Sequence, residues 1–190
     1  MEKKIFNTKT LVLMAAFAAL LSASAYISIP LPIPGAPHLT FLNFVVLLIA
    51  FLFDGIQPAL IVLVWLLLGV LGVPVFIGGA SGIGYLIAPW GGYTWAFLII
   101  AIIAPLIRGK KYNRLRYTIL TIAMAILTDL IGMFYLMIVG NNSIKFGFFY
   151  GFLPFLPLDI VKAVVVAQIV PLMKNALSFG KEQNKRNSKS

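Results

Sequence analysis

The feature that most limits how this chain can fold is a series of long apolar segments separated by short polar ones. Six such segments occupy residues 10–29, 39–53, 56–73, 92–107, 117–139 and a final stretch that ends near Met173. A helix needs about 20 apolar residues to cross a bilayer, and 61% of the chain is hydrophobic while only 11% is charged. We therefore predict an all-α integral membrane protein with six transmembrane helices, forming a single membrane domain over residues 10–178.

Lysine and arginine are concentrated in three polar segments. Three of these residues precede the first apolar segment, five lie between the fourth and fifth, and five follow the sixth. Because positive residues favour the cytoplasmic side of a membrane, six crossings place all three segments there. We predict a basic cytoplasmic N-terminus over residues 1–9 and a basic, disordered cytoplasmic tail over residues 179–190. The net charge of +10 then reflects topology in the lipid bilayer, and no nucleic-acid partner is expected.

Two unusual segments fall on the opposite, outer side in this topology. Residues 30–38 contain four prolines, which exclude a helix and predict an extended loop, with His38 as a surface residue. Residues 73–95 are rich in glycine yet apolar, and irregular backbone at membrane depth must be buried in protein or line a cavity. We predict a structured glycine-rich outer loop that closes over a ligand pocket. Its candidate ligand contacts are Phe76, Gly79, Gly82, Tyr85, Trp90 and Gly91.

Asp159 and Lys162 form a pair of opposite charges inside the sixth apolar segment. Their spacing places both side chains on one helix face, and Pro157 suits the first turn of that helix. A charged residue inside a membrane segment costs ~2.5–3.5 kcal/mol and usually marks a functional site. The pair is either a neutralised packing element or the polar floor of a binding pocket, and we favour the pocket floor.

Small residues and absent residue types add two further expectations. Ala15, Ala19 and Ala23 recur every four residues and form a smooth ridge, which favours either internal helix packing or docking of another subunit. The chain has no cysteine and only one histidine, so we expect neither a metal site nor a cofactor.

With these motifs in hand, the chain resembles the BioY family, the biotin-specific substrate-binding components of energy-coupling factor transporters. The strongest match is LLLGVLGVPVFIGGASGIGYLIAPWGGY at residues 66–93, followed by PLDIVKA at residues 157–163. The chain departs from the family pattern at three positions. Trp90 replaces a usual threonine, Leu158 replaces a usual glycine, and Leu42 stands where glutamine is expected.

This resemblance implies a biotin-binding component of a vitamin uptake system in a prokaryotic cell membrane, and not an enzyme. Its implied partners are a transmembrane coupling subunit, which docks on Ala15 and Ala19, and two ATPase subunits. Asp159 would accept ureido N–H groups and Lys162 would donate to the biotin carbonyl or carboxylate. Which end of biotin meets which charge stays open.

The acidic residues and Lys162 are also compatible with two other functions. A self-sufficient ion-coupled secondary transporter would use Asp129, Asp159 and Lys162 as a proton relay. An intramembrane enzyme would use Asp129 and Asp159 as a carboxylate dyad. Lys162 argues against a dyad because it favours a charged Asp159. Asp129 is better explained as a packing residue or as support for the pocket.

Overall fold

The structure is a computed structural model that describes residues 7–32, 37–109 and 111–187. Its elements, in chain order, are α1 (Thr8–Ser24), β1 (Ser28–Ile29), β2 (Leu39–Thr40), α2 (Leu42–Leu52), α3 (Gln57–Val70), the 3-10 turn η1 (Ile77–Gly79), α4 (Ile83–Ile87), α5 (Gly91–Ile107), α6 (Arg114–Val139), α7 (Ile144–Phe146), the π-helical turn η2 (Gly147–Phe152) and α8 (Leu156–Asn187).

The long helices coincide with the apolar segments of the sequence, which confirms the helical architecture. Two helical segments, α6 and residues 156–177 of α8, are long and apolar enough to cross a membrane. By contrast, α2 has 11 residues, so it is about 16 Å long, roughly half of a ~30 Å hydrocarbon core. Six complete crossings therefore stay a prediction. The two short strands are an exception to the all-α expectation.

The α2 helix forms the centre of the bundle. Every residue from Val45 to Leu52 is buried, and the helix packs against both α5 and α8. A helix that is apolar on all sides is stable only when it is surrounded by protein or lipid, and here its neighbours are other helices. This central position explains how residues at the start of α2 come close to α8, more than 100 residues later in the chain.

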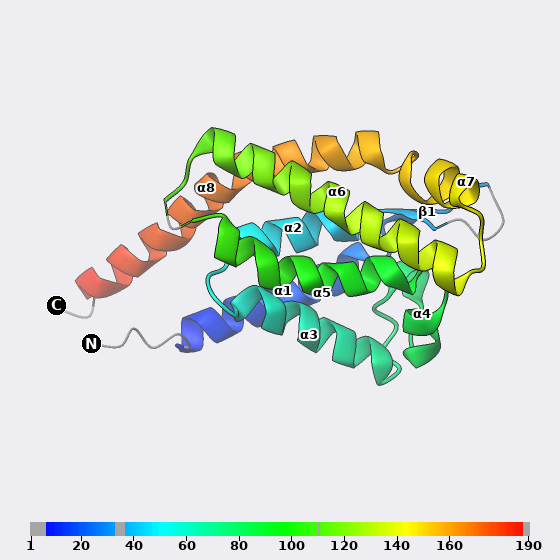
Figure 1. Cartoon of the computed structure of the whole chain (residues 1–190). Coiled ribbons are helices and arrows are strands. Elements are labelled where there is room, and N and C mark those ends of the chain that lie inside the picture. The colour runs from blue at the N-terminus through cyan, green and yellow to red at the C-terminus, as the bar shows by residue number, and fades with distance from the viewer. Residues whose placement is uncertain (1–6, 33–36, 110, 188–190) are drawn as a thin grey trace.

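The elements divide between the two ends of the bundle (Figure 1). The start of α1, the last turns of α8 and the connection from α5 to α6 lie at one end, while α4, α7 and β1 lie at the other. The described parts of the three basic segments thus share one end, as the charge pattern predicts. Which end faces the cytoplasm stays a prediction.

The proline-rich and glycine-rich segments both fold at the end of the bundle that carries α4. β1 and β2 pair antiparallel, with Ser28 opposite Thr40; residues 33–36 of the predicted loop lie outside the described residues. In the glycine-rich segment, Gly82 has a φ of +86° and its N–H donates to the Gly69 carbonyl oxygen at 2.7 Å. This bond ties the segment back to the end of α3. Its location on the outer side of a membrane stays a prediction.

The last helix is longer than the sequence pattern suggests. The apolar segment ends near Met173, whereas α8 continues to Asn187 and so includes most of the stretch predicted as a disordered tail. Polar, basic residues can extend a helix beyond the apolar core because helix formation is cooperative once a stable segment exists. The division into terminal segments and one membrane domain stays a prediction.

Candidate ligand-binding site

A cavity of about 410 Å³ is lined by residues of β2, α2, α4, α5, α6 and α8 and of the neighbouring loops. Its volume falls within the usual range for small-molecule sites. Its lining residues are Leu31, Pro37, His38, Thr40, Asn43, Ile77, Ala80, Tyr85, Trp90, Tyr93, Phe97, Thr128, Asp129, Phe155 and Asp159. The walls are mostly apolar and aromatic, and a few polar groups are gathered on one side.

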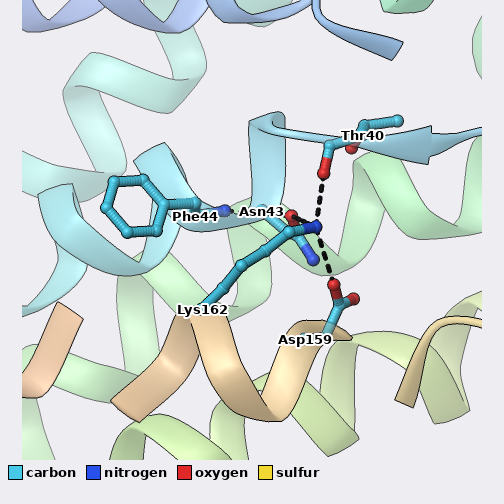
Figure 2. Close-up of polar contacts among 5 residues, drawn as sticks. All are labelled: Thr40, Asn43, Phe44, Asp159 and Lys162. Carbon is cyan, nitrogen blue, oxygen red and sulfur yellow. Dashed lines mark hydrogen bonds and ion pairs between the residues drawn. The ribbon is translucent and has the colours of Figure 1, made fainter. Parts of the chain in front are cut away.

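Lys162 joins three polar residues that line the cavity (Figure 2). Its Nζ donates to Oδ1 of Asp159 at 2.9 Å, to the carbonyl oxygen of Thr40 at 2.6 Å and to Oδ1 of Asn43 at 3.1 Å. An ammonium group has three donors and no acceptor, so all of its hydrogen-bonding capacity is used. The predicted ion pair is confirmed, and it also joins α8 to β2 and α2.

Local structure holds each of these groups in place. α8 begins at Leu156, so Pro157 occupies the first turn as predicted, and the Asp159 N–H donates to the Phe155 carbonyl oxygen at 2.9 Å. A carboxylate in the first turn is favoured by the partial positive charge of a helix N-terminus. Oδ1 of Asn43 also accepts the N–H of Phe44 at 3.0 Å, which orients the amide toward Lys162.

Aromatic side chains form layers on another side of the cavity. The Tyr85 ring stacks on Phe76 at 4.8 Å between centroids, and Phe76 meets Trp65 edge to face at 5.3 Å. Burial raises the pKa of Tyr85 to about 12, so its phenol stays protonated. Tyr93 donates its hydroxyl hydrogen to the Gly151 carbonyl oxygen, which connects α5 to η2 beside the cavity.

The residues predicted to contact a ligand fall into two groups. Asp159, Tyr85 and Trp90 line the cavity, and Lys162 is held against Asp159 with its side chain 11% exposed. Lys162 itself is not a lining residue, and the other four predicted contacts are not lining residues either: Phe76, Gly79, Gly82 and Gly91. Their predicted ligand contacts remain predictions.

Two of these four residues have a clear packing role. Phe76 is fully buried behind Tyr85. A Cβ atom at Gly91 would collide with the Leu86 backbone, so the residue allows α4 to pack closely on the start of α5. At Gly91 the absence of a side chain therefore permits close contact between two backbone segments.

Several cavity residues were missed or misjudged from the sequence. The prediction that His38 is a surface residue is wrong: it is half-buried, it lines the cavity, and its Nδ1 has no hydrogen-bond partner among the described residues. Asn43 was not identified, although an amide at the start of an apolar segment was a usable signal. Asp129, interpreted as packing or support, reaches the cavity itself.

The alanine ridge of α1 is exposed. Ala15, Ala19 and Ala23 all lie on the surface of the described structure, so the ridge is not used for packing within this chain. Separately, the residues that the structure describes contain no group of three or more potential His, Cys, Asp or Glu metal ligands.

The fold and the paired charges can now be compared with known proteins. The model of the BioY family matches residues 1–179. The chain belongs to the BioY family. The "Probable biotin transporter BioY" of Pyrococcus horikoshii is 40% identical over 85% of this chain and 96% of its own length. The "Biotin transporter BioY2" of Lactococcus lactis subsp. cremoris is 32% identical over 90% of this chain and 94% of its own length.

A solved structure supports the same fold. The crystal structure of the S-component for biotin from an ECF-type ABC transporter has a TM-score of 0.79 and 24% identity, covering 88% of this chain and 91% of that one. The relatives are named as transporters, so the prediction of a non-enzyme is confirmed. Family membership likewise favours the substrate-binding prediction over the ion-coupled alternative.

Proposed function

We propose that this chain is the biotin-binding membrane component of an ATP-driven vitamin uptake system. The observation that carries the proposal is a largely apolar cavity with an ordered Asp159–Lys162 pair on one side. The names of the BioY relatives support biotin as the ligand. The proposed location is a prokaryotic cell membrane, with both termini cytoplasmic and the cavity on the outer side.

The chemistry of biotin matches the two kinds of surface in the cavity. Biotin has a planar ureido group, a sulfur-containing ring, an aliphatic chain and a carboxylate. Tyr85, Trp90 and Phe97 offer apolar contact to the rings and chain, while Asp159 offers an acceptor for ureido N–H donors. Because Lys162 already fixes Asp159, little conformational freedom is lost when the ligand binds.

Energy for uptake must come from partner subunits in this account, because the sequence contains no nucleotide-binding motif. The proposed partners are a transmembrane coupling subunit and two ATPase subunits. The exposed Ala15–Ala19 ridge would allow a partner helix to approach α1 closely.

The ligand assignment is tested with purified wild-type protein. Mass spectrometry should find biotin in the purified sample, and calorimetry of ligand-free protein should detect binding of biotin but not of thiamine or riboflavin. Absence of biotin binding, with heat from one of the other vitamins, would overturn the substrate assignment.

Docking is tested separately by adding bulk to the ridge. Ala15→Trp and Ala19→Trp should retain biotin affinity but reduce cellular uptake to background, because the large ring prevents close helix contact. Ile119→Trp, at an exposed apolar position of α6, is the matched control and should transport normally. Normal uptake by both ridge variants at normal expression would contradict docking on α1.

A further inference from the structure

Asp129 is the buried acidic residue that the proposed Asp159–Lys162 site leaves unexplained. It lies in the second half of α6, is only 2% exposed and lines the cavity. Its Oδ2 has no hydrogen-bond partner among the described residues. Buried polar atoms in proteins are almost always paired, so an unpaired carboxyl oxygen at a cavity wall calls for a specific explanation.

Two neighbouring side chains already use their donors elsewhere. Lys162 uses its three donors on Asp159, Thr40 and Asn43. The hydroxyl of Thr128, the residue before Asp129, donates within its own helix to the Met124 carbonyl oxygen at 2.9 Å. Because Asp129 lines the cavity, a ligand there can offer a donor to its unpaired oxygen.

We propose that Asp129 is a second ligand-binding carboxyl, which accepts an N–H donor from the same ligand head group that Asp159 binds. Taking that ligand as biotin rests on the function proposed above. The ureido group carries two N–H donors on either side of one carbonyl, and two acidic residues on one cavity can accept one each. The arrangement also orients the ligand, because its N–H donors have to face the two acidic residues.

This role has a consequence for the protein without ligand. An acidic side chain that is buried without a donor disfavours the empty, folded state. Replacing Asp129 should therefore preserve or raise the melting temperature of the ligand-free protein while weakening ligand binding. A residue that serves only packing would behave in the opposite way, since its loss would lower the melting temperature and spare the affinity.

The experiment compares Asp129→Asn and Asp129→Leu with Thr121→Val by biotin calorimetry and by ligand-free melting in detergent. Thr121 is also buried in α6, bonds within its own helix and is not among the cavity-lining residues, so it controls for loss of a buried polar group. We expect the Asp129 variants to bind biotin about 10- to 150-fold more weakly, the range for one hydrogen bond to a charged group. The Thr121 variant should retain wild-type affinity.

Unchanged biotin affinity in both Asp129 variants would overturn the proposal. If the wild type itself fails to bind biotin, the proposed function fails at that step, before any variant is compared.

Ligand analogues supply an independent measurement that needs no stable leucine variant. Biotin methylated at one or the other ureido nitrogen loses one donor at a time. Methylation at the nitrogen that faces Asp129 should weaken binding in the wild type but have little further effect in Asp129→Asn, because both changes remove the same contact. Fully additive effects for both nitrogens would overturn the proposal.

Discussion

Two groups of buried polar contacts lie at opposite ends of the bundle, and they differ in what their side chains face. At the end with the start of α1 and the last turns of α8, Arg108 is 2% exposed and donates to the carbonyl oxygens of Phe51 and Phe53 and to Asp54. At the other end, Lys162 is equally well paired, but its partner Asp159 borders a cavity and Asp129 has an unpaired oxygen there.

The comparison separates a charge that holds the fold from charges that hold a ligand. The last carbonyl groups of a helix lack partners within the helix, and Arg108 satisfies such groups of Phe51 and Phe53 at the C-terminal end of α2. Its contacts are complete within the protein. At the cavity, the donors of Lys162 are all used, but one oxygen of Asp129 has no partner among the described residues. That oxygen is available to a ligand.

The largest effect on stability is expected from Arg108→Met. It leaves two buried carbonyl oxygens without a donor, at about 1–3 kcal/mol each, so the ligand-free melting temperature should fall clearly while the folded fraction keeps its biotin affinity. Asp54→Asn is the matched control: the Asp54 side chain is 85% exposed and asparagine keeps an acceptor oxygen, so this variant should lose less stability than Arg108→Met. If Arg108→Met and the wild type had the same melting temperature, Arg108 would not be a stabilising contact of the fold.

Lys162→Met should differ from Arg108→Met by weakening biotin binding, although it too leaves buried acceptors without a donor. Loss of the ammonium releases Asp159 and the backbone at Thr40, and biotin affinity should fall about 10- to 150-fold. Calorimetry measures the affinity, and Arg108→Met serves as the reference for a buried cation at the other end. If Lys162→Met loses as much stability as Arg108→Met and the folded fraction binds biotin normally, Lys162 serves the fold and not the ligand.

His38→Leu should have the smallest effect. Its unpaired Nδ1 borders the cavity, and a single neutral hydrogen bond contributes ~0.5–1.5 kcal/mol, or about 2- to 13-fold in affinity. His38→Asn, which keeps a polar atom, should recover part of that loss in the same titration. An affinity loss as large as that of Lys162→Met would show that the outer loop contributes a principal contact.

The local patterns of the sequence predicted much of the helical frame and one contact of the site. Apolar segments located the long helices, Pro157 located the start of α8, and the three-residue spacing brought Asp159 and Lys162 together. These features succeed because each depends on residues within one or two helical turns.

The rest of the site depends on contacts between distant parts of the chain. The Lys162 bonds to Thr40 and Asn43 span 122 and 119 residues, and no local spacing encodes them. His38 was assigned to the surface because a proline-rich segment predicts a loop but not what that loop covers. Phe76 was assigned to the ligand wall because an aromatic residue can either line a cavity or support the ring that does.

The most direct test of the central claim is the biotin dissociation constant of Asp159→Asn, measured by calorimetry beside its ligand-free melting temperature. The substitution keeps the shape of a side chain that is buried beside the cavity and removes its charge and one acceptor oxygen. We predict near-native melting and an affinity about 10- to 150-fold below that of the wild type. A large loss of stability with unchanged affinity in the folded fraction would contradict the account and leave the Asp159–Lys162 pair as part of the scaffold.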